Sequence, residues 1–376
     1  MGLCLQQLSF RNFRNYQDFL LQEIGSLTIF VGPNAAGKTN IIEGIDLLTA
    51  ITSFRHPKTH QLVTWGFESS RLQAQLGDGS RKLAVELQIK DDKKSYQLNG
   101  KTKRIHDLKG ILPAVCFSPD DLTLIKGAQS IKRSALDAVG SQLSANYYAV
   151  RKDYEKILQQ KNRVLKEGVG PEYLASINEV FISIGAQLSF KRAEIFSKMR
   201  PYIQEYYHVI TGQTEQVRGA YFPSWQNRDQ EVFLDNPFTT DEARDALYRV
   251  ISANQTYEIE RKRALFGPHS DAIEFFIEGK NAGIYGSQGQ QRSLVLSFKL
   301  AEVSLLQDIL GEKPLLLLDD VMSELDMVRR TALIQFISGD IQTFITTTHL
   351  DYFTEELLAR ARIVYLEKSS LYGVTE

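Results

Sequence analysis

The chain has 376 residues, of which 43% are hydrophobic and 24% charged, and its formal net charge at pH 7 is -1. This length exceeds one typical domain, so two domains are expected. The balanced charge excludes a surface that is basic all over, and an anionic partner therefore has to be bound by a local patch.

The two cysteines, Cys4 and Cys116, exclude a disulfide scaffold and a zinc site built from paired CxxC motifs. The N-terminal residues lack the apolar segment of a secretory signal, and no run approaches the roughly 20 apolar residues that span a bilayer. We therefore expect a soluble, cytoplasmic protein.

The first 110 residues or so read mostly as strands with one helix. Residues 27–34 predict an apolar strand that runs into a Gly-Pro turn, and residues 41–51 have helical spacing. Residues 71–76, 82–89 and 95–100 alternate between apolar and polar side chains, which predicts a meander of strands.

From about residue 130 the pattern becomes helical. Residues 147–165 predict one helix, ended near Gly168, and a second long helix is expected from about Tyr173 to about Ile210, with a kink at Pro201. Residues 223–240 predict an exposed loop, and residues 241–255 return to helix.

Strand patterns resume after residue 264, at 272–279, followed by a long helix at 293–310 and two buried strands at 314–320 and 343–349. We therefore predict an α/β fold in which residues 1–125 and 260–376 form a P-loop α/β core with an N-terminal β-meander. Residues 126–259 are predicted to form a helical second lobe inserted into that core.

The segment "GPNAAGKT" fits the phosphate-binding pattern GxxxxGK[ST], with an apolar strand before it and a helix after it. Its backbone N–H groups are expected to face phosphate oxygens, Lys38 to reach the β- and γ-phosphates, and Thr39 to supply a hydroxyl to Mg²⁺. The predicted ATP-binding residues here are Gly32, Pro33, Asn34, Ala35, Ala36, Gly37, Lys38, Thr39 and Asn40.

Two further strands carry candidate catalytic residues at their carboxyl ends. "LLLLDD" reads as a strand covered on both faces, and Asp319 stands where a P-loop ATPase holds magnesium, together with Thr39. Asp320 could polarise the attacking water. His349 ends the next strand, and beside the other motifs it is expected to contact a γ-phosphate. Catalytic roles are therefore assigned to Asp320, Lys38 and His349.

"YGSQGQQ" lies directly before the long helix at 293–310. With the other motifs it points to ABC-type ATPases, in which such a segment closes over the nucleotide of a second subunit. Ser287, Gln288 and Gly289 are therefore expected to act in trans, offering a hydroxyl, backbone amides and a helix N-terminus to the γ-phosphate. An ordinary N-cap at Ser287 is compatible with this role.

Within this class the chain resembles the RecF family of bacterial recombination-repair ATPases, which are related to SMC proteins. The resemblance rests on motifs along nearly the whole chain: "LSFRNFRNY" at 8–16, "GPNAAGKTNIIEGIDLL" at 32–48, "FSPDDLTLIKG" at 117–127, "YEKILQQKN" at 154–162, "GPHSD" at 267–271, "SQGQQRS" at 287–293 and "LLLLDDVMSELD" at 315–326. The resemblance implies a weak, DNA-stimulated ATPase that dimerises with ATP on gapped or junction-bearing duplex DNA. It also implies cooperation with RecR and RecO, and help in loading RecA, in DNA replication, the SOS response and the repair of DNA damage.

The chain departs from the family pattern in places. Ser270, Asp271 and Ala272 follow "GPH", where an Arg and a double Asp are common, and this puts in doubt the DNA or partner contacts near residue 270. Ala36 stands where the family often has Gln, and Lys132–Arg133 where it has paired arginines.

Several basic positions are candidates for DNA contact, although basic segments are usually solvated surface. They are Arg11, Arg14, Arg55, Lys58 and the run "KTKR" at 101–104. Two alternatives stay open: the ATPase subunit of another ABC-type complex, such as a transporter, and a DNA-binding scaffold with negligible ATP turnover.

Overall fold

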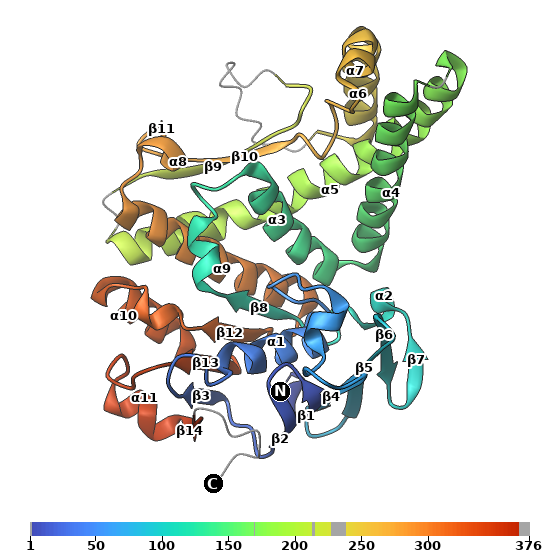
Figure 1. The fold of residues 1–376 in the computed structure, drawn as a ribbon. Helices are drawn as coiled ribbons and strands as arrows, with labels where there is room; N and C mark the ends of the chain where they lie inside the picture. The colour runs from blue at the N-terminus through green and yellow to red at the C-terminus, as the bar shows by residue number, and fades with distance from the viewer. Residues whose placement is uncertain (1, 169, 213–214, 227–237, 368–376) are drawn as a thin grey trace. The chain divides into compact units, whose positions relative to one another are not determined.

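The protein was analysed as a computed structural model that describes residues 2–168, 170–212, 215–226 and 238–367 (Figure 1). The chain forms two compact units. The first unit contains residues 1–122 and 302–376, and the second contains residues 123–301. The first boundary lies close to the predicted one at 125, whereas the chain returns to the first unit at 302 and not at 260.

A parallel five-stranded sheet forms the centre of the first unit, with strand order β14-β3-β13-β12-β8. Its strands, in this spatial order, are Arg362–Tyr365, Leu27–Val31, Thr343–Thr347, Leu315–Asp319 and Ala114–Phe117. Strands β3, β13 and β12 are buried along their whole length, because both faces of the sheet are covered. The two buried strands predicted near the end of the chain are confirmed.

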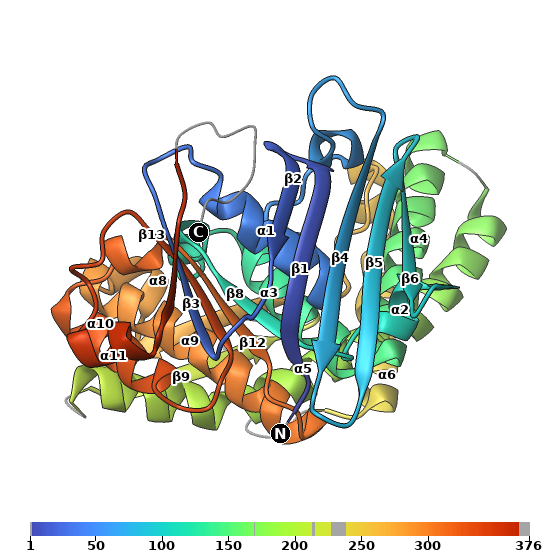
Figure 2. The same cartoon turned by 90° about the horizontal axis from the view of Figure 1, so that it is seen from below.

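The same unit holds an antiparallel six-stranded sheet in the order β2-β1-β4-β5-β6-β7. Its strands, in chain order, are Cys4–Phe13, Tyr16–Leu21, Ser69–Gly77, Lys82–Lys90, Lys93–Leu98 and Lys101–Lys103. Strands β1, β4 and β5 lie side by side in Figure 2, and buried and exposed residues alternate along β4. The predicted meander is therefore confirmed.

Helix α1 (Lys38–Thr49) contacts strands of both sheets, β12 and β13 in one and β4 and β5 in the other. One hydrophobic core joins the three, with Ile41 and Ile45 of α1 fully buried in it. Gly44 faces Phe10 of β1 so closely that a Cβ atom there would overlap the phenyl ring. This close approach fixes the position of α1, and with it the loop from which the helix begins.

The remaining elements of the first unit are short segments that connect or cover the sheets. They are η1 (Thr59–Leu62), α2 (Ile105–Leu108), η2 (Pro119–Thr123), η3 (Val321–Ser323), α10 (Met327–Ile337) and α11 (Glu355–Arg360). Helix α9 (Gln288–Leu310) begins in the second unit and ends in the first.

The second unit is mostly helical (Figure 1). Its helices, besides the start of α9, are α3 (Gln129–Leu143), α4 (Ala145–Glu167), α5 (Pro171–Thr211), α6 (Thr240–Ala253), α7 (Gln255–Arg261) and α8 (Ala282–Tyr285). Helix α4 ends before Gly168, as predicted, and Gly168 has a left-handed conformation. Helix α5 continues through Pro201, and the kink there stays a prediction. Part of the predicted loop, residues 227–237, lies outside the described residues. Residues 223–226 of it are buried or half-buried, so the expected exposure is wrong there.

A three-stranded antiparallel sheet in the order β11-β10-β9 explains why residues 260–301 belong to the second unit. Strand β10 (Ala272–Ile277) pairs with β9 (Val217–Phe222) on one side and with the short β11 (Lys280–Asn281) on the other. Ladder hydrogen bonds to β9 therefore hold this segment with the helices, although its strand pattern resembles the other strands of the chain.

Among the residues that the structure describes, no helix is long and apolar enough to cross a membrane.

Gly44→Ala tests the contact between α1 and β1. In an unobstructed helix this change would stabilise by about 1 kcal/mol. Here we expect a net loss of about 1–3 kcal/mol in the free energy of unfolding, because Phe10 is packed against Phe13 and Phe19 and has no room to move. Denaturant unfolding measures this free energy. Gly25→Ala is the control, since a Cβ there meets only the Leu27 carbonyl oxygen, at 3.8 Å, and equal stability of the two variants would contradict the prediction.

Candidate functional site

The loop between β3 and α1 depends on its glycines for its backbone conformation and its close packing. Gly32 donates its N–H to the carbonyl of Thr347 at 3.3 Å, which joins the loop to the end of β13. Gly37 has φ +94°, and a Cβ atom there would overlap the side chains of Asn15 and Tyr16. A residue larger than glycine is therefore excluded twice, by backbone conformation and by space.

Lys38, the first residue of α1, is only 6% exposed. Its Nζ donates to the carbonyl oxygens of Gly32 at 2.7 Å and Pro33 at 3.0 Å. Burial lowers the pKa of Lys38, and the carboxylates of Asp320 and Asp319 oppose that shift. The ammonium group is thus held inside the loop, close to two acidic groups.

Thr39 and Asp319 meet as predicted, although they are 280 residues apart in the sequence. The Thr39 hydroxyl donates to Asp319 Oδ1 at 3.0 Å, and the hydroxyl of Thr346 donates to the same oxygen at 2.8 Å. Burial raises the pKa of Asp319, against the effect of both hydrogen bonds. Sequence reasoning missed Thr346, whose signal was the run of threonines in the strand before His349.

Asp320 has a left-handed backbone conformation, with φ 53°. Its N–H donates to the hydroxyl of Thr346 at 2.9 Å, and its Oδ1 is buried without a hydrogen-bond partner among the described residues. Burial raises the pKa of Asp320 and the nearby Glu324 adds to the rise, while Lys38 and His349 oppose it. Its carboxylate therefore holds a proton more readily than an exposed one.

His349 is exposed and packs edge-on against Tyr352, with ring centroids 6.4 Å apart. The guanidinium of Arg330 lies over the Tyr352 ring, 4.4 Å from its centroid, and donates to the carbonyl of Leu325 at 2.9 Å. Arg330 and Tyr352 thus connect the segment after Asp320 with the predicted catalytic histidine. No motif in the sequence marked these two residues.

Ser287, Gln288 and Gly289 lie in the second unit, at the start of α9. The Ser287 side chain accepts the N–H of Gln290 at 3.2 Å, and the Gln290 side chain accepts the N–H of Ser287 at 2.8 Å. The expected N-cap is confirmed, and it forms a reciprocal capping box. Ser287 and Gln288 are exposed, so both can contact another molecule.

The basic residues predicted as DNA contacts differ in whether they already bond to a carboxylate of the protein. Arg14 donates from Nε and from Nη2 to the two carboxylate oxygens of the buried Glu43, at 2.8 Å each. Arg55 lies 3.5 Å from the same carboxylate. Arg14 therefore holds Glu43 of α1 and is a structural residue. Arg11, Lys58 and the run at 101–104 are exposed, with Arg104 within 3.4 Å of Asp107.

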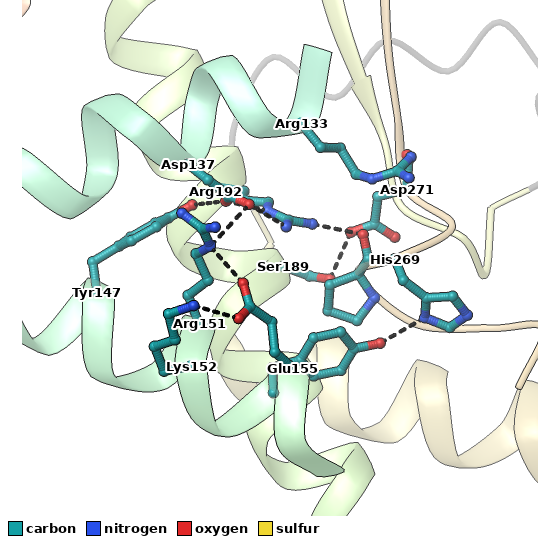
Figure 3. A network of polar contacts seen from close by, with 12 residues as sticks. Arg133, Asp137, Tyr147, Arg151, Lys152, Glu155, Ser189, Arg192, His269 and Asp271 are labelled. Carbon is teal, nitrogen blue, oxygen red and sulfur yellow. Dashed lines mark hydrogen bonds and ion pairs between the residues drawn. The ribbon is translucent and has the colours of Figure 1, made fainter. Parts of the chain in front are cut away.

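The segment "GPHSD" at 267–271 is part of a buried polar network inside the second unit (Figure 3). The Asp271 carboxylate accepts hydrogen bonds from the Ser189 hydroxyl at 2.7 Å and the Ser224 N–H at 2.7 Å, and also from the Tyr221 hydroxyl. Arg133 donates to the Asp271 carbonyl at 2.7 Å. Asp271 thus stabilises its own unit, which accounts for an acid at this position without any external contact.

Arg192 continues this network. Its guanidinium forms a bidentate pair with Asp137, at 2.8 and 2.7 Å, and donates to the carbonyl of Pro268 at 2.6 Å. His269 bonds to Tyr154 at 2.7 Å, and burial lowers the pKa of His269 to about 4, so the imidazole is neutral at pH 7. The network ties α3, α4 and α5 to the strand that follows residue 271.

Residues 4–370 match the family model for the RecF/RecN/SMC N terminal domain, so the fold is that of a RecF/SMC-type head. Curated relatives cover the chain almost completely. The chain is 35% identical to the DNA replication and repair protein RecF of Listeria monocytogenes serotype 4b (98% of this chain, 99% of the relative), and 32% identical to that of Limosilactobacillus reuteri (98% of each). The chain belongs to the RecF family.

Solved structures agree with this assignment. The recombination mediator protein RecF with ATPrS, from the RecFOR pathway, matches with a TM-score of 0.88 and 27% identity over 99% of this chain and 98% of that one. The Smc head domain of Pyrococcus furiosus matches with a TM-score of 0.53 at 15% identity, over 96% of this chain and 93% of that one, which is a likeness of fold alone. The family assignment decides against a transporter subunit.

Asp320→Asn should raise the melting temperature of the ligand-free protein at pH 8. A raised carboxyl pKa means that the folded chain binds the proton more tightly than the unfolded chain, so stability falls as pH rises from the unfolded pKa through the folded one. The amide removes this cost, and asparagine also tolerates the left-handed conformation. The gain should disappear near pH 4.

Asp326→Asn is the control, because Asp326 is an exposed N-cap of α10, asparagine caps equally well, and a surface ion pair such as the one with Arg329 contributes little. We expect its melting temperature to stay near that of the parent. A lower melting temperature for Asp320→Asn at pH 8 would contradict the inference that the ionised Asp320 carboxylate destabilises the folded chain.

Proposed function

We propose that this chain is an ATP-dependent DNA-binding protein of DNA replication and recombinational repair, and that it hydrolyses ATP slowly. The hydrogen bond between Thr39 and Asp319, at 3.0 Å, is the observation that carries the proposal. It brings the hydroxyl of the phosphate-binding loop and the acid of a distant strand to one point, as P-loop ATPases require for a magnesium nucleotide.

The residues present fit ATP with Mg²⁺. Thr39 and Asp319 supply the hard oxygen ligands that Mg²⁺ prefers. Asp320 has a buried carboxylate oxygen without a partner among the described residues, and this oxygen is kept for the attacking water. The N-terminus of α1 and the ammonium of Lys38 offer positive charge to the phosphates. When bound, Mg²⁺ neutralises charge that develops on the phosphate oxygens.

Asp320 and His349 carry the chemistry in this proposal. The raised pKa of Asp320 makes its carboxylate a better proton acceptor near neutral pH, and its side chain would orient the attacking water. This side chain is one methylene shorter than the glutamate usual in ABC transporters, so we expect loose positioning and slow turnover. His349 would contact the γ-phosphate, held there by Tyr352.

Two copies of the chain are proposed to enclose the nucleotide. Ser287, Gln288 and Gly289 of one copy would cover the phosphates bound to Lys38 and Thr39 of the other. The capping box supports this role, because it fixes the start of α9 while leaving the Ser287 side chain exposed. ATP would then act as the switch for dimerisation.

DNA is the proposed partner of the ATP-bound dimer, in particular duplex with a single-stranded gap or a junction. RecF relatives are named DNA replication and repair proteins, and a solved relative belongs to the RecFOR pathway. We therefore propose RecR and RecO as protein partners, loading of RecA as the outcome, and the cytoplasm as the location. Arg11, Lys58 and the run at 101–104 are exposed candidates for phosphate contact.

A scaffold that binds ATP without turning it over is a second candidate, favoured by the short side chain of Asp320. Steady-state phosphate release, with and without gapped DNA, separates the two. Measurable release that DNA stimulates supports the ATPase, and release no faster than from Lys38→Ala supports the scaffold.

Mixing two inactive variants tests the shared site. Lys38→Ala removes the phosphate-binding ammonium, and Ser287→Arg blocks the segment that acts in trans. A mixed dimer has one site with both defects and one site with neither. An equal mixture should therefore regain roughly a quarter of the parent rate of phosphate release, because half of the dimers are mixed. No recovery at any ratio, with dimers shown to form, would argue against the trans arrangement.

Thr346→Val tests the support of the two acids. The change keeps the shape of the side chain but removes its hydrogen bonds to Asp319 and to the N–H of Asp320. We expect the rate of phosphate release to fall about 10- to 100-fold with little change in fold, as when a partner of a metal ligand is lost.

Thr28→Val provides an isosteric control in the neighbouring strand. Thr28 is fully buried and its hydroxyl has no hydrogen-bond partner among the described residues, so valine should leave both turnover and stability intact or improve stability. If both variants lose activity alike, the effect is not specific to Asp319.

A further inference from the structure

Trp65 is 97% exposed, and the nearby Phe67 is 43% exposed. An indole is the largest side chain that a protein can present to water, and a surface position of this kind carries a hydrophobic cost unless it meets a partner. Neither residue belongs to the nucleotide site or to the core, so their exposure calls for another explanation.

The turn that carries Trp65 is firmly anchored. Thr64 donates its N–H to the carbonyl of Asn12 at 2.9 Å and its hydroxyl to the carbonyl of Tyr16 at 3.3 Å. Phe67 N–H closes the turn on the Thr64 carbonyl at 3.1 Å, with Gly66 at φ +86°. The indole is therefore presented by a fixed backbone on a buried Thr64, and little ordering is needed when it binds.

Basic residues precede this turn in the chain and adjoin the residue that anchors it. Exposed residues of the preceding segment are Arg55, His56, Lys58 and His60, and Arg11 is exposed beside Asn12. The acidic neighbours include Glu68, which is exposed, Asp92, which lies 3.6 Å from His60, and Asp18, which is exposed and pairs with Arg11 across the β1–β2 ladder. Between residues 53 and 68, the chain has Lys58, Arg55, which also contacts Glu43, and two histidines against one carboxylate. This arrangement favours an anionic partner with a flat apolar face.

We propose that Trp65 stacks on an unpaired base of single-stranded DNA, with Lys58 and Arg11 available to the adjacent phosphates. Aromatic side chains among basic ones are the usual platform for single strands, since every base has a face to stack. Paired bases hide that face inside the duplex. The inference rests on the proposed DNA-binding function and names the residue that recognises the unpaired part.

A protein partner fits the surroundings of Trp65 less well. Tryptophan residues at the centre of protein interfaces are normally ringed by contacts that exclude water. Here the neighbours in the turn are Gly66 and the partly exposed ring of Phe67, Glu68 follows, and the flanking segment is polar and basic. Charge complementarity therefore favours nucleic acid.

The first experiment uses the fact that the chain has two tryptophans, Trp65 and Trp225. Trp225 is half-buried against Phe238, and Trp225→Phe leaves Trp65 as the sole indole. We would titrate this full-length variant, with ATP and Mg²⁺, with a gapped duplex and with a blunt duplex of equal length. Tryptophan emission reports stacking, and the anisotropy of a label on the DNA reports binding.

Stacking predicts that the gapped duplex quenches the emission of Trp65, whereas the blunt duplex binds without quenching it. If the gapped duplex binds and the emission does not change, stacking is wrong although DNA binding stands. If neither DNA binds, the proposed DNA-binding function fails, and the stacking inference fails with it.

The second experiment measures affinity for the gapped duplex by anisotropy. Trp65→Ala should weaken it about 5- to 150-fold, the range for loss of one stacked base, and Trp65→Phe should restore much of it. Tyr248→Ala, which removes an aromatic ring that is 62% exposed in α6, is the control and should bind as the parent does. Thermal melting verifies that all variants fold.

Equal affinity of Trp65→Ala and the parent for gapped DNA would overturn the proposal. The exposed indole would then be better explained by contact with a protein. An equal loss for gapped and blunt DNA would also overturn it, because only the gap offers an unpaired base that can stack on the indole.

Discussion

The parallel register of β12 against β13 is the constraint on which the nucleotide site depends. It pairs Asp319 with Thr346, and β13 in turn pairs Thr347 with Val31 at the end of β3. The carboxyl ends of three strands therefore meet at one edge, and the loop after β3 turns over it. A slip of one residue would point Asp319 to the opposite face of the sheet and separate it from Thr39. Helix α1 holds this edge in place, because its contacts in the core fix the positions of Lys38 and Thr39 at its start.

The charges at this edge are costly in the folded chain. Burial raises the pKa of Asp319 and Asp320 and lowers the pKa of Lys38, so each group is driven toward its neutral form. Their mutual attraction offsets only part of that cost. Groups held in this way are typical of sites that gain stability when a ligand of complementary charge binds. A magnesium nucleotide has both signs of charge, which suits the acids and the lysine together.

The sequence predicted the parts of this site that have short local patterns. The phosphate-binding loop, the apolar strand before Asp319 and the N-cap at Ser287 depend on neighbouring residues, and all three have the expected form. Arg330 and Tyr352 could not be found in this way, because their roles arise from contacts between distant segments. The run of threonines before His349 marks Thr346, but only the contact with β12 shows its role. Arg14 read as a surface charge for the same reason, since its partner Glu43 lies on another element.

The second unit shows a related limit. Strand β10 has the same pattern as strands of the first unit, and only its pairing with β9 assigns it to the helices. The buried network around Asp137, Arg192 and Asp271 then fixes that assignment, because removing one partner would leave a buried charge unpaired. Alternation of apolar residues predicts that a strand exists, but not which sheet it joins.

The turn at Asn12–Tyr16 gives the nucleotide loop a physical connection to the proposed DNA contact. On one side, Asn15 accepts a hydrogen bond from Asn40 at 2.7 Å and the Tyr16 hydroxyl lies 3.5 Å from the Ala36 carbonyl. On the other side, the same turn accepts both hydrogen bonds of Thr64, the residue before Trp65. Gly37 leaves no space between the turn and the loop, so a shift of the loop on binding phosphate has to move the turn. Direct packing of this kind is a means by which nucleotide state could change how firmly the indole is presented.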